Sequence, residues 1–242
     1  MERKRLLIHA LKLRRERGDN LQVAETLRFI SSANQMLGLP KEGISQVKEA
    51  LGIYEQFDNK SGQTQSLQHL ADLLYDDGQL DAAEEAASRL IDLPTEGEQF
   101  TLCDCYRLLG RICCSKGEAE KAINHFETAL GIASSYNWDN HLFWIHHDLV
   151  VLFLDEDRFD DAQAAIERAK SHAINHPYRL GRAMVLQAQV WYRQRRFEEA
   201  KSEALRAADV HEKLGAARDL EFCRALLRDI EEEMQKPVTS GD

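Results

Sequence analysis

The chain has 242 residues, of which 43% are hydrophobic and 30% are charged, and its formal net charge is −10 at pH 7. This length allows one large domain or two small ones, and the hydrophobic share is sufficient to bury a core. The acidic balance disfavours nucleic acid as a partner, because binding phosphates requires a basic face. The longest hydrophobic stretch, Leu149 to Leu154, is far shorter than the roughly 18 residues of a membrane-spanning helix, so no membrane partner is expected.

The N-terminal segment MERKRLLIHALKLRRERG begins like a signal peptide, with three basic residues before an apolar run. Lys12 interrupts that run, and no small-residue cleavage site follows it. The five cysteines are an odd number in a chain that is too long to need disulfide bonds, which favours a reducing compartment. We therefore expect a cytoplasmic protein without a targeting segment.

Internal repetition determines the expected architecture. The string Ala-Leu-Gly-Ile at Ala50 recurs at Ala129, 79 residues later, and Arg-Phe-Asp-Asp-Ala at Arg158 recurs as Arg-Phe-Glu-Glu-Ala at Arg196, 38 residues later. Both matches indicate a period of 38 to 40 residues. In chain order we predict a half-repeat over 1–18, five repeats over 19–60, 61–98, 99–138, 139–176 and 177–214, a capping helix over 216–235 and a disordered tail over 236–242.

The third repeat shows most clearly what one unit contains. Tyr106, Leu109 and Cys113 have the spacing of one helical face, and Gly117 is suited to end that helix in a left-handed conformation. A second helix then carries an aromatic residue between two alanines on one stripe, which lets the two helices approach closely. Each repeat is therefore predicted to be a pair of helices.

This pattern resembles the tetratricopeptide repeat, and degenerate copies of it cover about residues 19 to 210. The residues of the third repeat that stand in the family's order are Leu109, Gly110, Gly117, Ala122, Phe126 and Ala129. The resemblance implies an all-α, right-handed solenoid of about five helix pairs plus flanking helices. It also implies a concave groove, lined by the first helix of each pair, that binds a protein or peptide partner.

Eight residues are candidates for that groove because they take exposed positions on the first helices. They are Arg28, Arg107, Arg111, Trp144, His147, Leu154, Arg182 and Tyr192. Arg107 and Arg111 lie one turn apart and can present two guanidinium groups to a carboxylate or phosphate. Alternatively, they pair with Asp72 or Asp104 on neighbouring helices. Trp144 either anchors a partner side chain or is buried between repeats.

Family members that clamp the acidic tails of chaperones use a Lys and an Asn on the first helix. This chain has Arg28 and Ser32 at the equivalent places, and His69 in the second repeat where a further Asn would stand. These departures disfavour a chaperone tail as the partner.

A finer resemblance concerns the stretches SKGEAEKAINHFETAL, NWDNHLFWIHHDL and EKLGAARDLEFCR. They are similar to the repeat arrays of fungal multidomain NTPases of the NACHT and NB-ARC type. The chain itself has no P-loop motif, so an ATPase would have to lie elsewhere in a longer protein. The alternative function is therefore a structural spacer, sensor or weakly self-associating region, in which the basic residues 1–18 and the other terminal helix take part.

The sequence shows no pattern for catalysis, cofactor binding or metal binding. Cys103 and Cys105 are two residues apart, so they point to different faces of a helix, and we interpret the cysteines as reduced structural thiols. His172 and His176 have a spacing that could share a metal, but Pro177 interrupts the helix there. We expect no catalytic residues, no metal and no cofactor.

Overall fold

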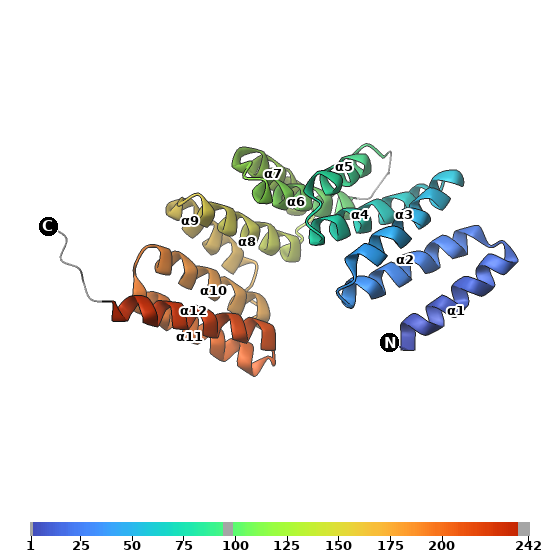
Figure 1. Ribbon diagram of the computed structural model, residues 1–242. Coiled ribbons are helices and arrows are strands. Elements are labelled where there is room, and N and C mark those ends of the chain that lie inside the picture. Colours follow the sequence, from blue (N-terminus) through green and yellow to red (C-terminus); the bar gives the residue numbers. More distant parts are fainter. Residues whose placement is uncertain (1, 94–98, 237–242) are drawn as a thin grey trace. The chain divides into compact units, whose positions relative to one another are not determined.

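The computed structural model describes residues 2–93 and 99–236, with side chains from residue 4 onward. Within these ranges the chain forms 12 α-helices and no strand, which confirms the all-α prediction (Figure 1). The helices are α1 Glu2–Arg17, α2 Asn20–Met36, α3 Pro40–Gln56, α4 Lys60–Asp76, α5 Leu80–Ile91, α6 Gln99–Ser115, α7 Ala119–Ser135, α8 Asp139–Asp155, α9 Phe159–Ser171, α10 Pro177–Arg193, α11 Phe197–Lys213 and α12 Ala217–Gln235.

Each of the helices α2, α4, α6, α8 and α10 is followed, two residues after its last residue, by a residue with a left-handed backbone. The φ angles are 71° at Gly38, 76° at Gly78, 73° at Gly117, 55° at Asp157 and 60° at Arg195. These positions are 40, 39, 40 and 38 residues apart, so the period of the sequence is also a period of the backbone. Three glycines adopt this conformation without a steric cost, whereas the last two positions use Asp and Arg.

The end of α6 shows how such a turn is closed. The N–H of Gly117 donates to the carbonyl of Cys114 at 3.0 Å, and the N–H of Glu118 donates to the carbonyl of Cys113 at 2.9 Å. These bonds satisfy the last carbonyls of the helix, which have no partner in the following turn. The prediction that Gly117 ends the first helix of its pair is confirmed.

The pair α6 and α7 packs closely around one aromatic ring. Ala122, Phe126 and Ala129 are each 0% exposed. A Cβ atom placed on Gly110 of α6 would lie 2.5 Å from Cε1 of Phe126, so the ring lies directly on the helix backbone. The close approach predicted for the two helices therefore depends on Gly110 as well as on the small alanines.

The chain divides into two compact units, residues 1–129 (unit 1) and 130–242 (unit 2), with the boundary inside α7. In unit 1, α2 packs on α4 and α4 packs on α6. In unit 2, α8 packs on α10 and α10 packs on α12. Within each unit, helices from alternate places in the chain thus lie side by side, and the candidate sites lie along them.

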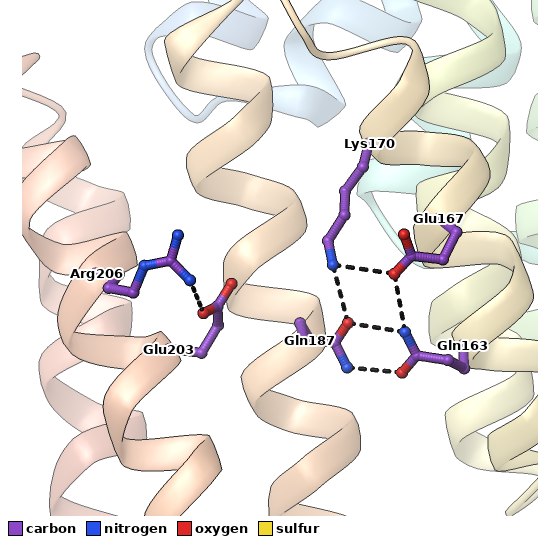
Figure 2. Close-up of polar contacts among 6 residues, drawn as sticks. All are labelled: Gln163, Glu167, Lys170, Gln187, Glu203 and Arg206. Atoms are coloured by element: carbon purple, nitrogen blue, oxygen red, sulfur yellow. Dashed lines mark hydrogen bonds and ion pairs between the residues drawn. The ribbon is translucent and has the colours of Figure 1, made fainter.

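The interior of unit 2 contains polar side chains that are hydrogen-bonded to one another (Figure 2). Gln187 on α10 is 1% exposed, and its amide faces that of Gln163 on α9, with N···O distances of 2.7 and 3.0 Å. The Lys170 ammonium donates to the same oxygen of Gln187 at 3.1 Å. Glu203 on α11 is 6% exposed and pairs with Arg206 at 2.5 Å. The buried Gln187 and Glu203 are thus hydrogen-bonded, and the contacts of Gln187 join α9 to α10, whereas the Glu203 pair lies within α11.

The two ends of the chain are described to different extents. The helix α1 lies within the segment 1–18, and α12 lies within 216–235. Of the tail predicted to be disordered, residues 237–242 lie outside the described residues. In the part of the chain that is described, no helix combines the length and the apolar composition needed to cross a bilayer.

Candidate partner-binding site

Two adjoining hollows lie along α8, α10 and α12 in unit 2. Their volumes are about 290 Å³ and about 600 Å³. Phe222 and Ala225 of α12 line both, so the hollows are neighbours, and we refer to them together as the unit 2 groove.

The smaller hollow is mainly apolar. Val151 on α8 is 41% exposed and Phe222 on α12 is 46% exposed, although both line a concave surface. Leu154 and Leu226, which are 6% and 7% exposed, also line it. Exposed apolar side chains gathered in a hollow are typical of sites that anchor a partner side chain.

The larger hollow contains a fixed arginine. The Arg182 guanidinium donates to Asp219 Oδ1 at 2.9 Å and contacts His147 Nε2 at 2.8 Å. It lies 5.9 Å from the centre of the Trp144 ring, and the Tyr178 hydroxyl donates to the other oxygen of Asp219 at 3.2 Å. Because a guanidinium can only donate, His147 accepts this bond through an unprotonated Nε2. Arg182 is therefore held as part of the wall of the hollow.

Five of the eight predicted groove residues belong to this site. Trp144 and Arg182 line the larger hollow, Leu154 and Tyr192 line the smaller one, and His147 holds Arg182. Trp144 is half-buried and meets Phe143 edge-on, so its ring is only partly covered by its own helix and remains partly accessible at the hollow.

The sequence interpretation missed the contribution of α12. It treated 216–235 as a cap, whereas Phe222 lies between the two hollows and the exposed Arg218 and Arg228 line the larger one. The signal was present in the spacing, because α12 begins 40 residues after α10 and Phe222 lies 40 residues after Arg182. The repeat period therefore extends through the last described helix.

In unit 1, a cavity of about 200 Å³ lies between α4, α5 and α6. The polar residues that line it are Gln68, Asp72, Asp104, Arg107 and Arg111. The Arg111 guanidinium lies 4.6 Å from the centre of the Tyr75 ring, and the Gln68 amide donates to Asp104 at 3.4 Å. The two arginines are thus brought together as predicted, but beside two carboxylates.

The electrostatics of this cavity do not favour an anion. Burial, together with the carboxylates of Asp104 and Asp76, raises the pKa of Asp72 to about 6, although the nearby Arg111 and Arg107 act to lower it. A ligand carboxylate or phosphate would meet the same repulsion.

Arg28 lies in a different hollow of unit 1, of about 360 Å³, beside residues of α2, α3 and α4. Its side chain is half-buried, and its Nε atom has no hydrogen-bond partner among the described residues. Burial, together with the charge of Arg28, lowers the pKa of His69 to about 4, so His69 is neutral at pH 7.

The cysteines and histidines show no arrangement for redox or metal chemistry within the described residues. None of the five cysteines is disulfide-bonded, and burial raises the pKa of Cys103 to about 11 and that of Cys105 to about 12, which keeps these two thiols protonated. His172 bonds Asp139 at 2.9 Å and stacks on His146. Across residues 2–93 and 99–236, no group of three His, Cys, Asp or Glu side chains is placed to hold a metal ion.

We compared the chain with protein families, with proteins of known sequence and with solved structures. No protein-family model matches the chain. The kinesin light chain-related protein 3 of Arabidopsis thaliana is 23% identical over 200 residues, which are 79% of this chain and 30% of that protein, so the chain spans less than a third of this relative.

Three solved structures have similar architecture. BtubC (BKLC) from P. vanneervenii superposes with a TM-score of 0.72 at 19% identity, covering 87% of this chain and 89% of that one. A STAND ATPase from Pyrococcus horikoshii with a tetratricopeptide repeat sensor gives 0.70 at 16% identity, covering 85% and 32%. A Rap protein complexed with Competence and Sporulation Factor gives 0.63 at 15% identity, covering 96% and 71%. The chain therefore has a tetratricopeptide-like helical repeat fold, as the sequence pattern predicts.

Proposed function

We propose that the chain is a non-catalytic protein-interaction module whose unit 2 groove holds an extended segment of a protein partner. The observation that carries this proposal is the pair Val151 and Phe222, two exposed apolar side chains on different helices that line one hollow. Two neighbours of known structure support an interaction role. The Rap protein was solved with a bound factor, and the Pyrococcus protein carries its repeats as a sensor.

In this proposal the smaller hollow receives one large apolar side chain of the partner. Burying such a side chain is worth about 1.5–3 kcal/mol, which makes it the main anchor. The larger hollow receives the neighbouring part of the segment. There Trp144 offers a flat surface, and Arg218 and Arg228 add positive charge.

Selection from a random peptide display library tests the proposal without knowledge of the partner. We expect peptides selected on the wild-type chain to share a large apolar residue and to bind at least tenfold more weakly to Val151→Asp and Phe222→Asp. Leu205→Asp is the matched control, because Leu205 is 52% exposed on α11 and lines neither hollow. Equal binding by folded groove variants, or peptides that Leu205→Asp weakens equally, would refute the assignment.

We also propose that the arginines of unit 1 contact the partner, separately from the unit 2 groove. Arg28, Arg107 and Arg111 line hollows beside the helices α2, α4 and α6. We expect the double variant Arg107→Glu, Arg111→Glu to weaken partner binding while the helices remain folded by circular dichroism. Unchanged affinity of the folded variant would remove these residues from the site.

A second candidate function is a sensor or spacer region of a larger switch protein, such as the fungal NACHT and NB-ARC proteins. It is favoured by the Pyrococcus STAND protein, of which this chain matches only 32%. Leu6 and Ile8 of α1 are 66% and 51% exposed, which suits weak self-association. If α1 is an assembly surface, light scattering will show smaller particles for a chain without residues 1–18, and an unchanged size will exclude it. The odd number of cysteines, none of which is disulfide-bonded, supports a cytoplasmic location.

A further inference from the structure

The unit 1 cavity contains a carboxylate and a guanidinium that do not bond to each other. Asp72 on α4 and Arg111 on α6 both line it, and neither side chain forms a hydrogen bond or an ion pair with any described residue. Arg111 is held instead by its stacking on the Tyr75 ring at 4.6 Å. Partly buried charged groups that lack a hydrogen-bond partner are costly, so a ligand that hydrogen-bonds to both would be bound favourably.

The charged residues around Asp72 and Arg111 disfavour both a cationic and an anionic ligand. A cation that approached Asp72 would also meet Arg107 and Arg111, which line the same cavity. An anion that approached Arg111 would meet Asp72 and Asp104. A neutral group that offers a donor and an acceptor together meets neither repulsion, and its hydrogen bonds would both be strengthened by a charged partner.

We propose that this cavity binds a planar amide group of a protein partner, whose N–H donates to the Asp72 carboxylate and whose carbonyl accepts from the Arg111 guanidinium. The amide is either the carboxamide of an Asn or Gln side chain or a peptide bond of the backbone. The site belongs to unit 1 and shares no residue with the unit 2 groove, so it stands or fails independently of that groove.

Four small probes of similar size test the ligand class on the full chain by NMR titration of the backbone amides. They are propionamide, N-methylpropionamide, propionate and propylammonium. We expect saturable shifts in α4 and α6 with an amide, and at least tenfold weaker binding of the two ions. Tighter binding of propionamide identifies an Asn or Gln side chain, and equal or tighter binding of the N-methyl amide identifies the backbone. No saturable binding by either amide, or an ion that binds as tightly as the better amide, overturns the proposal.

Variants show whether the binding occurs at this cavity. Asp72→Asn and Arg111→Gln are each expected to weaken amide binding at least fivefold. Arg89→Gln makes the same chemical change at an exposed ion pair with Glu55, outside the cavity, and should leave binding unchanged. If Arg111→Gln does not fold, Arg111→Lys replaces it, since it keeps the charge but loses the planar donor pair. Folded Asp72 and Arg111 variants that bind the amide like the wild type would contradict the assignment.

Discussion

The contact between Gly110 and Phe126 allows a quantitative test of how one helix pair is held together. In Gly110→Ala the new methyl group would lie 2.5 Å from Cε1 of a fully buried ring, which is closer than carbon atoms can approach. Overpacking of this kind costs about 1–3 kcal/mol, and the better helix propensity of alanine returns about 1 kcal/mol. We therefore expect the single variant to lose up to about 2 kcal/mol of unfolding free energy.

The effect of Gly110→Ala on the unfolding free energy should change from destabilising to stabilising when the Phe126 ring is removed. Phe126→Ala alone is expected to cost about 3–5 kcal/mol, because the side chain is 0% exposed. In that background the alanine at position 110 has space, so only its helix propensity remains and it should stabilise by about 0.5–1 kcal/mol. Gly52→Ala in α3 is the matched control, because nothing lies within 4 Å of its Cβ position, and it should stabilise by a similar amount.

Urea denaturation followed by circular dichroism measures the free energy of unfolding of the four chains in this double-mutant cycle and of the control. Because repeat proteins can unfold in stages, the comparison uses variants whose transitions keep the same slope. A coupling energy of about 1–3 kcal/mol is expected, since the two residues are in direct contact. Additive effects, or a destabilising alanine at position 110 in the Phe126→Ala background, would refute the packing described for this pair.

Three further predictions concern strain, charge and buried amides. Arg195→Gly should stabilise the chain by about 0.5–1 kcal/mol in urea denaturation, because Arg195 has a left-handed φ of 60°, and lower stability would contradict this. Asp72→Asn should raise the melting temperature at pH 7.5. The pKa of Asp72 rises to about 6 on folding, so its ionised form is disfavoured in the folded state. This gain should fade as the pH falls from 6 to below 4, and a gain independent of pH would count against the stated cause. Gln163→Ala should cost about 1–3 kcal/mol, because it leaves the buried Nε2 of Gln187 without its acceptor, whereas replacing both glutamines by leucine should cost less; equal losses would contradict this.

The fold could be predicted because one period controls both packing and chain reversal. The left-handed positions that follow α8 and α10 carry Asp157 and Arg195 instead of glycine, so residue type alone does not locate these turns. The two turns lie 40 and 78 residues after Gly117, in step with the period, because each repeat must place its turn at the same point to pack on its neighbour. Local preference was thus overridden by the regular stacking of helices.

The candidate site could be predicted only in part. The period correctly placed Trp144 and Arg182 on helices that line one hollow. It could not show that Arg182 is bonded to Asp219, because that contact joins residues 37 apart through side-chain conformations. It also could not show the raised pKa of Asp72, which depends on burial and on charges from two helices. Pairings between charged side chains require three-dimensional distances, which a one-dimensional pattern does not contain.

The most direct test of the central claim is photo-crosslinking from the unit 2 groove in an extract of the native cells. A photoreactive phenylalanine analogue is placed at Val151 or Phe222, and at the control position Leu205 on α11. We predict that both groove positions crosslink to the same partner protein, through one short segment of it, and that Leu205 does not. Crosslinks to that partner from Leu205 with equal yield, or no common partner for Val151 and Phe222, would contradict the proposal that this groove is the binding site.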